Sequence, residues 1–484
     1  MSSAPIIVHT KMEKSNSVSN SKPKNGEAKQ TSLSKQCVLE EPHNSLWSLN
    51  MNLAYLLGIV LRLLLLSADD DRSLTNRVEL ATPLNSFARL TEGVTLWRDH
   101  RIDPYSGVIF HETPLTLYLF SSVPSSMVPI LFVLIDVIAA LMIGFLAREM
   151  VKYYLQEQNE QDSERHQDAE ELCLSLEELN KMERRSQLVY LFHPYLVGNC
   201  VAKTTTTIAN LILVIFLLAT VKRKRTIACL FLALATYQSF YPIMLIFPLC
   251  ICLAQSHRNS NSPSQVLTRV VLPTIRDFLL FFGLLNLVSY ELMGKNWSFL
   301  GSTHGFILSV PELTPNIGLF WYFFTEMFEH FRLFFVWTFQ LNCFIYVMPL
   351  SIQFRKHPFV LTWTLIALTA IFKSYPCYGD VGLYLALLPI LAHLFPYMKQ
   401  MFIVGNMFLA ATVLGPVLYQ MWIYNGSANS NYFFAINLVF GTAQIFLVTD
   451  LLFAQIKREF YLKNGFKALQ PTGDPQKDLK LVMK

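Results

Sequence analysis

The chain has 484 residues, of which 52% are hydrophobic and only 15% are charged. A soluble protein cannot bury so much apolar surface, and the apolar runs repeatedly approach the roughly 20 residues that a membrane-spanning helix needs. The strictly alternating segments typical of a transmembrane β-barrel do not occur in the sequence. The net charge of +5 is small and argues against a nucleic-acid partner, which would require a basic face. The composition predicts an all-α polytopic membrane protein.

The N-terminal segment differs from the rest of the chain. Residues 1–45 are polar, rich in Ser, Lys and Asn, and lack an apolar period, so they are expected to form a disordered cytoplasmic tail. No cleavable signal peptide is expected before the first apolar run, which would act as an uncleaved signal anchor. The transmembrane domain is predicted to cover residues 46–460, and residues 461–484 to form a cytoplasmic C-terminal tail.

Apolar runs follow one another through the remaining sequence and predict about twelve transmembrane helices. Some runs are short for a full crossing of the hydrocarbon layer. They lie at 50–66, 127–147, 187–200, 204–221, 226–238, 240–255, 273–293, 330–352, 358–373, 379–396, 402–424 and 432–453.

Basic loops set the expected orientation, because short loops rich in Lys and Arg remain in the cytoplasm. Lys222–Arg225, Arg355–His357 and the charged segment 148–185 are therefore assigned to the cytoplasmic side. The opposite, lumenal face then carries two long segments, 67–126 and 294–329. Both mix aromatic residues with Pro and scattered charge, which predicts amphipathic helices at the membrane interface. They are expected to roof a cavity between the spans.

Ionisable residues within apolar runs are costly, so each is either paired or functional. Arg62, Asp136, Glu291 and Asp450 are such residues, and Arg62 would form a buried pair with Asp136 or with Asp450. On the lumenal side, Asp69–Asp71 would suit a divalent cation and a lipid phosphate, or else form a solvated loop.

The sequence offers no complete catalytic constellation. His111 stands beside Glu112 as a conceivable acid/base pair, but there is no evident Ser/His/Asp or Cys/His arrangement and no glycine-rich phosphate loop. The eight cysteines lack the paired spacing of zinc sites. No cofactor and no metal are expected.

Two N-glycosylation sequons fall on the predicted lumenal face, beginning at Asn296 and Asn425. Asn425 stands very close to the end of a predicted span, where a glycosyltransferase would reach it poorly. Asn296 is therefore the candidate for glycosylation.

Five long sequence blocks carry a family resemblance. They read DPYSGVIFHETPLTLYLF (103–120), FLALATYQSFYP (231–242), FILSVPELTPNIGLFWYFFTEMFEHF (306–331), IFKSYPCYGDVGLYLALLP (371–389) and WIYNGSANSNYFFAI (422–436). Together they resemble the PIG-U family, the U subunit of the glycosylphosphatidylinositol (GPI) transamidase of the endoplasmic reticulum. The blocks occur in family order between about residues 50 and 465.

The chain also resembles, more distantly, the GT-C glycosyltransferases. The shared cues are Glu92-Gly93, Pro104-Tyr105 and Thr113-Pro114-Leu115, followed later by GLYLALLP. Those enzymes carry an acid-x-acid pair shortly before the Glu-Gly, where this chain has Asn76–Glu79. The resemblance therefore implies a GT-C-like scaffold that has kept a lipid cavity and lost its chemistry.

The resemblance implies a non-catalytic subunit in the endoplasmic reticulum membrane. It would bind the GPI lipid and present it for attachment to the C-terminus of precursor proteins, while a caspase-like cysteine subunit performs the chemistry. The implied partners are the GPI lipid, the sister subunits and membrane lipids. Two alternatives stay open: an active lipid-linked mannosyltransferase of GPI assembly, which would need Asp69–Asp71, and a structural scaffold that does not touch lipid.

The polar stretch between the last two apolar runs supplies the first group of candidate contacts. Asn429 and Asn431, with Ser430 between them, are predicted to contact the GPI headgroup, because an Asn side chain offers donors and acceptors together. The structural alternative is turn chemistry, in which Asn431 would cap the final helix.

The second group lies in the lumenal segment 294–329. Asn316, Phe320 and Trp321 are predicted to form an aromatic wall beside the lipid. His111, from the first lumenal segment, is a further candidate.

Overall fold

The computed structural model describes residues 45–69, 74–160, 174–255 and 263–465. The contacts between residues divide the chain into two units, Met1–Leu46 and Trp47–Lys484. The fold described below is that of the second unit. Every regular element among the described residues is helical. This agrees with the all-α class that the composition predicts.

The α-helices are long near both ends of the chain and shorter in the two predicted lumenal segments. In chain order they are α1 (Ser45–Ala68), α2 (Phe87–Arg98), α3 (Pro114–Ser122), α4 (Val128–Glu160), α5 (Leu176–Phe192), α6 (Pro194–Val201), α7 (Thr206–Val221), α8 (Arg225–Ser239), α9 (Ile246–Gln255), α10 (Pro263–Val266), α11 (Leu272–Leu292), α12 (Ser298–Leu300), α13 (Phe306–Ser309), α14 (Phe320–Glu326), α15 (Glu329–Phe344), α16 (Val347–Gln353), α17 (Pro358–Phe372), α18 (Tyr378–Leu387), α19 (Met401–Ile423) and α20 (Ser430–Asn464). The 3₁₀ helices are η1 (Pro104–Ser106), η2 (Ser125–Met127), η5 (Tyr241–Leu245) and η8 (Leu388–Tyr397). The π-helical turns are η6 (Leu267–Val271) and η7 (Gly301–Gly305).

Seven helical stretches of the described chain are long and apolar enough to cross a membrane, as expected for a polytopic membrane protein. Shorter apolar helices, among them α7 and α17, accompany them. Helical elements overlap all twelve predicted runs, but the runs at 187–200 and 330–352 are each divided between two helices. In the first of these, α5 ends before Pro194, and Pro194 begins α6. The count of about twelve crossings and the GT-C-like scaffold remain predictions. The seven stretches are Met51–Ala68, Ser125–Asn159, Ser264–Leu292, Glu329–Gln353, Tyr378–Tyr397, Met401–Ile423 and Ser430–Asn464.

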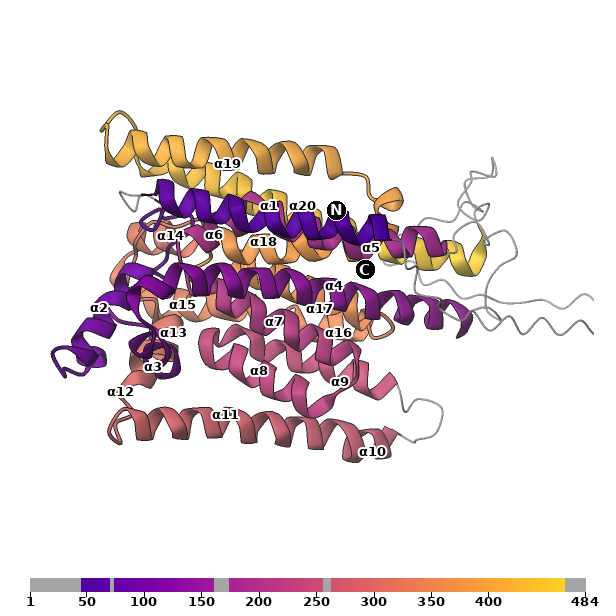
Figure 1. Ribbon diagram of the computed structural model, residues 1–484, viewed down its shortest axis with the longest axis horizontal. Coiled ribbons are helices and arrows are strands. Elements are labelled where there is room, and N and C mark those ends of the chain that lie inside the picture. The colour runs from indigo at the N-terminus through magenta and orange to yellow at the C-terminus, as the bar shows by residue number, and fades with distance from the viewer. Residues whose placement is uncertain (1–44, 70–73, 161–173, 256–262, 466–484) are drawn as a thin grey trace, which may run out of the picture. The chain divides into compact units, whose positions relative to one another are not determined.

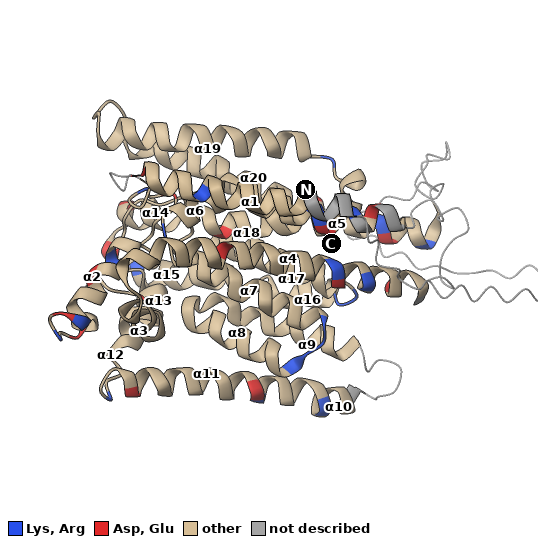
Figure 2. Cartoon of the chain, viewed as in Figure 1, with Lys and Arg blue, Asp and Glu red and all other residues tan. Residues whose placement is uncertain are grey.

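The long helices run alongside one another, and neighbours in sequence are often neighbours in space (Figure 1). α4 packs against α5 and α7, α7 against α8, and α8 against α11, while α19 packs along α20. α19 carries no Lys, Arg, Asp or Glu along its length (Figure 2). Such uncharged, outward-facing helices suit contact with hydrocarbon.

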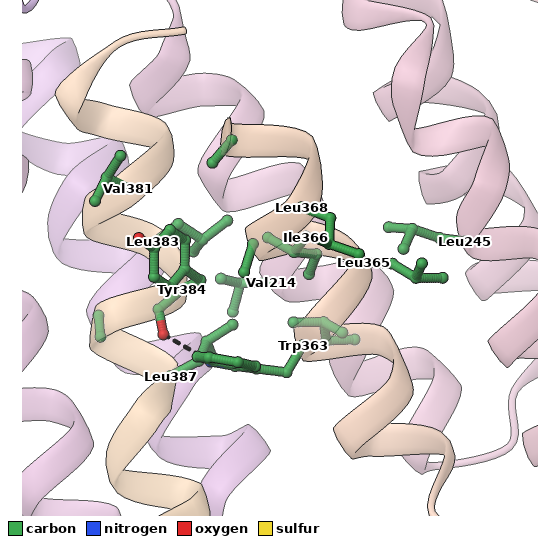
Figure 3. Close-up of a cluster of buried hydrophobic side chains, with 14 of the residues drawn as sticks. Val214, Leu245, Trp363, Leu365, Ile366, Leu368, Val381, Leu383, Tyr384 and Leu387 are labelled. Atoms are coloured by element: carbon green, nitrogen blue, oxygen red, sulfur yellow. Dashed lines mark hydrogen bonds between the residues drawn. The ribbon is translucent and has the colours of Figure 1, made fainter. Parts of the chain in front are cut away.

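Helix α17 lies at the centre of the packing. It is apolar on every side and nearly all of its residues are buried, as expected for a helix without a polar face. Trp363 packs against α18, and its indole Nε1 donates to the carbonyl of Tyr384 at 2.8 Å (Figure 3). Leu365 and Leu383 extend this core, which holds α17 against its neighbours.

The predicted lumenal segments lie at one end of the helices. Figure 1 places α2, α3, α12, α13 and α14 there, together with the turn between α19 and α20. α2 is amphipathic as expected, because it buries Leu90 and Val94 and exposes Arg98. At the other end of the chain, α20 continues to Asn464, past the boundary predicted at residue 460. The predicted tails lie largely outside the described residues.

A buried ion pair joins α1 to α4. Arg62 Nε donates to Asp136 Oδ2 at 2.7 Å, and Tyr190 Oη donates to the other carboxylate oxygen at 2.9 Å. Both charged side chains are almost completely buried. Asp450, the alternative partner, instead accepts from the backbone N–H groups of Lys399 and Gln400 at the start of α19. Of the two partners predicted for Arg62, the structure therefore shows Asp136.

Removing one partner of this pair should destabilise the protein strongly. Asp136→Asn leaves an uncompensated buried guanidinium, which typically costs about 3–5 kcal/mol. Thermal unfolding of the detergent-purified protein should show the loss. The matched control is Asp99→Asn, which breaks an exposed pair with Arg98 and should change the unfolding temperature little. An unchanged midpoint in Asp136→Asn would refute a stabilising role for the pair.

A second charged contact ties together α4, α17 and α20 at the predicted cytoplasmic end. His357 precedes α17, and its Nε2 lies 2.6 Å from a Glu459 carboxylate oxygen, while its Nδ1 lies 3.2 Å from Glu157. Burial alone would lower the pKa of His357, but the hydrogen bonds and charges of the two glutamates outweigh it and raise the pKa to about 9. His393 and Arg458 are the neighbouring basic groups.

The raised pKa of His357 predicts a pH-dependent stability. The imidazole titrates near 6.5 in an unfolded chain and near 9 when folded. Its stabilising contribution is therefore complete below pH 6.5 and disappears as pH rises through about 9. The difference in unfolding temperature between the wild type and His357→Gln should shrink from pH 6 to pH 9. A constant difference would contradict the bridging imidazolium.

Candidate functional site

The polar stretch begins the last helix. Asn429 is the N-cap of α20, and its Oδ1 accepts from the backbone N–H of Asn431 at 3.1 Å. Capping by an Asn side chain satisfies one of the free N–H groups at a helix start. The capping residue is thus Asn429 rather than Asn431. Ser430 is the first residue of the helix.

Asn431 contacts the second predicted lumenal segment directly. Tyr322, on α14, donates its hydroxyl to Asn431 Oδ1 at 2.5 Å. The Tyr322 ring also stacks on Phe434, with ring centroids 4.1 Å apart and an angle of 11° between the planes. The hydrogen bond and the stack together fix α14 against the first turn of α20. Asn429 and Asn431 remain exposed at this contact.

Trp321 lies behind this contact rather than on an open wall. Only 3% of its surface is exposed. It stacks on Trp422 of α19 at 5.9 Å and approaches Phe433 and Phe434 of α20 at 5.8 and 6.0 Å. The indole therefore packs α14 against α19 and α20.

We call the exposed contact between these helices the α14–α20 seat. It consists of Asn429, Ser430, Asn431, Tyr322 and the ring of Phe434.

Asn316 forms hydrogen bonds with backbone groups of its own loop and with Asn437 of α20. It is buried, its Oδ1 accepts from the N–H of Gly318 at 2.8 Å, and its Nδ2 donates to the carbonyl of Thr314. Its own carbonyl accepts from Nδ2 of Asn437 on α20 at 2.8 Å. Asn316 thus positions the loop that leads into α14.

Phe320 and His111 belong to a different aromatic cluster. Phe320 packs edge-on against Phe339 at 5.2 Å, and His111 stacks on Phe306 at 3.5 Å. His111 Nδ1 lies 2.8 Å from the carbonyl of Ser302, and burial lowers the pKa of its imidazole. The structure therefore places Asn429, Ser430 and Asn431 together at the start of α20, while Trp321 packs against Phe433 and Phe434 of the same helix. Phe320 and His111 lie apart from the α14–α20 seat.

Sequence reasoning missed Tyr322 as a site residue. Helix α14 has only seven residues, too few for a hydrophobic period to show which side chain faces a partner. The available signal was its position next to Trp321 within the block 306–331, opposite the aromatic pair Phe433 and Phe434.

A cavity of about 100 Å³ with a mixed polar and apolar lining lies elsewhere, between α7, α8 and α17. Two of its charged lining residues form an ion pair, with Lys373 Nζ 2.6 Å from Asp380 Oδ2. Glu112 accepts from Thr205, and burial raises the pKa of its carboxyl to about 7. Within the described ranges, no three His, Cys, Asp or Glu residues group to hold a metal ion.

Two further predicted features are the acidic run Asp69–Asp71 and the sequon at Asn296. Asp69 Oδ1 accepts from the N–H of Leu74 at 3.1 Å, as in a turn, while Asp70 and Asp71 lie outside the described residues. Asn296 is exposed, and its Oδ1 accepts from the N–H of Ser298 at 2.9 Å. Glycosylation of Asn296 remains a prediction.

The apolar helices, the internally paired charges and the exposed polar residues at one helical end define a multi-pass helical membrane protein. The family model described as "GPI transamidase subunit PIG-U" matches residues 56–440, and the chain belongs to this family. The resemblance seen in the sequence blocks is thereby confirmed.

Relatives from animals and fungi extend this result. The chain is 39% identical to the human "GPI-anchor transamidase component PIGU" over 420 residues, which are 85% of this chain and 95% of the relative. Identity to the mouse protein of the same name is 39% over the same shares. The chain is 29% identical to the "GPI transamidase component GAB1" of Saccharomyces cerevisiae over 391 residues, 80% of this chain and 90% of the relative. The match therefore covers nearly the whole of each relative.

Proposed function

We propose that this protein is a non-catalytic subunit of GPI transamidase in the endoplasmic reticulum membrane. It binds the GPI lipid and presents it for attachment to the C-terminus of a precursor protein, while a caspase-like partner subunit performs the bond exchange. The relatives' names support the complex and the pathway. The single observation that carries the binding role is the exposed α14–α20 seat, held by the hydrogen bond between Tyr322 and Asn431.

The hydrogen bonds of the seat leave donors for a ligand. The cap uses Oδ1 of Asn429, and Tyr322 uses Oδ1 of Asn431. Each asparagine therefore keeps its NH₂ group for an external acceptor, such as a sugar hydroxyl or a phosphate oxygen. The start of a 35-residue helix also favours negative charge through its free N–H groups and its dipole. This polarity suits a phosphoglycan headgroup.

The surroundings of the seat suit the membrane surface. Tyr424 is 75% exposed and Tyr432 is 59% exposed, and tyrosines prefer the interface because they combine an apolar ring with a polar tip. Their rings flank the two asparagines in sequence. The seat thus offers amide donors, hydroxyl groups and aromatic faces, which serve binding rather than bond cleavage.

Substitution of the asparagines tests this proposal. Asn431→Ala removes an amide donor and the partner of Tyr322, and we expect a several-fold loss of a GPI-anchored reporter from the surface of complemented null cells. Asn429→Ala also loses a helix cap, worth about 1 kcal/mol. Asn429→Ser restores the cap without the amide, so it separates ligand binding from helix stability.

The control is Asn425→Ala, an exposed residue of the same turn, which should leave the reporter unchanged. Co-purification of the complex shows whether each variant still assembles. Normal reporter levels in both Asn431→Ala and Asn429→Ser would refute headgroup binding at these residues. Loss of assembly in both would support the scaffold alternative instead.

The lipid that accumulates in null cells separates the proposed subunit from a mannosyltransferase. A lipid-presenting subunit acts after GPI is complete, so we expect complete but unattached GPI. An enzyme of GPI assembly would leave a truncated glycan. Asp69→Ala should not change the glycan, because Asp69 accepts from a backbone N–H in a turn. A truncated glycan in either strain, measured by mass spectrometry of extracted lipids, would favour the enzyme.

A further inference from the structure

A narrow slot lies along α20 below the α14–α20 seat. It has a volume of about 70 Å³ and lies between α20, α17 and the loop that precedes α14. Asn431, Phe434, Leu438, Thr442 and Ile445 follow one another on α20 at spacings of three or four residues. Such residues share one face of a helix, so the slot continues the face that carries Asn431. Its apolar lining residues are Ile317, Leu319, Ala370, Ile371, Leu438 and Ile445.

The polar side chains that line the slot are already bonded within the protein. Asn437 Nδ2 donates to the carbonyl of Asn316, and Thr442 Oγ1 donates to the carbonyl of Leu438 at 2.8 Å. Gln444 donates to the carbonyl of Phe440 and accepts from the hydroxyl of Tyr384. A headgroup would find few free polar partners there, so the slot suits a hydrocarbon occupant.

Gly441 deepens the slot at its middle. A Cβ atom added at this glycine would meet no other atom within 4 Å. Leu438 and Ile445, one turn to either side, are 45% and 37% exposed. The helix surface is therefore indented between two exposed apolar side chains, and the indentation is open to an occupant.

The depth of the slot fits the hydrocarbon layer. Gly441 is ten residues after Asn431, so it lies about 15 Å further along the helix axis at about 1.5 Å per residue. The hydrocarbon core is about 30 Å thick. With Asn431 at the lumenal interface, the slot is centred near the middle of that core, at a depth that the ends of the acyl chains of a lumenal-leaflet lipid reach.

We infer that this slot holds one acyl chain of the GPI lipid whose headgroup occupies the α14–α20 seat. The inference rests on the proposed function and names a second part of the same ligand. The seat selects the lipid by polar contacts, and the slot fixes the position of its tail against α17 and α20. The two contacts together set where the headgroup emerges.

A bulky side chain at Gly441 tests the slot. Gly441→Phe places a large side chain where an added Cβ meets nothing within 4 Å, and it removes a helix-weakening glycine. The matched control is Gly405→Phe on α19, where an added Cβ also meets nothing within 4 Å. Null cells that express each full-length variant are fed a fatty acid carrying a mid-chain diazirine and an alkyne. The complex is then irradiated, purified and mapped by mass spectrometry.

We expect wild type and Gly405→Phe to show acyl crosslinks within residues 437–445 to a lipid that carries the GPI glycan. Gly441→Phe should reduce these crosslinks and the GPI-anchored reporter several-fold, with the complex intact. Unchanged crosslinks in Gly441→Phe, or crosslinks only to phosphatidylcholine, would overturn the slot. Asn431→Ala and Asn429→Ser are measured in parallel, and normal reporter levels in both would overturn the α14–α20 seat. A loss of the reporter and of the crosslinks confined to Gly441→Phe would then support the slot without the seat.

Discussion

A polar group inside a bilayer must find its partner within the protein, because the hydrocarbon layer supplies none. This constraint explains the main polar contacts between the spans. Arg62 meets Asp136 across α1 and α4, and Asp450 meets the backbone N–H groups that begin α19. The partners come from distant parts of the sequence, so each contact fixes one helix pairing. Apolar packing around α17 fills the space between them.

The same constraint separates the two parts of the proposed lipid site. At the predicted lumenal end, the side chains of Asn429 and Asn431 are exposed, and their NH₂ groups have no role in the cap or in the bond to Tyr322. Lower on the same helix, Asn437 and Gln444 are buried and bonded within the protein. Along the face of α20 that carries Asn431, the exposed side chains are instead the apolar Leu438 and Ile445. That change matches the order of headgroup and tail in a lipid.

The sequence predicted the helical class well because apolar runs report burial or lipid contact directly. It also predicted Arg62 as a paired residue, since an unpaired charge in a span is so costly, but it could not choose between Asp136 and Asp450, which requires the tertiary contact. Asn429 and Asn431 were found through the family block, whereas Tyr322 was missed because its role arises only when α14 meets α20. The separation of Phe320 from Trp321 follows from helix geometry, since adjacent residues on a helix point in different directions.

Helix α20 carries the α14–α20 seat at one end and Glu459 at the other, 28 residues away. At about 1.5 Å per residue, about 42 Å separates them, and the helix is continuous between the two points. At its far end, Glu459 pairs with the protonated His357, which also contacts Glu157 of α4. The helix is therefore held near both ends by polar contacts with other elements. If the proposed lipid site lies at one end of α20, the position of the headgroup would depend on an ion-paired histidine at the other end, about the thickness of a membrane away.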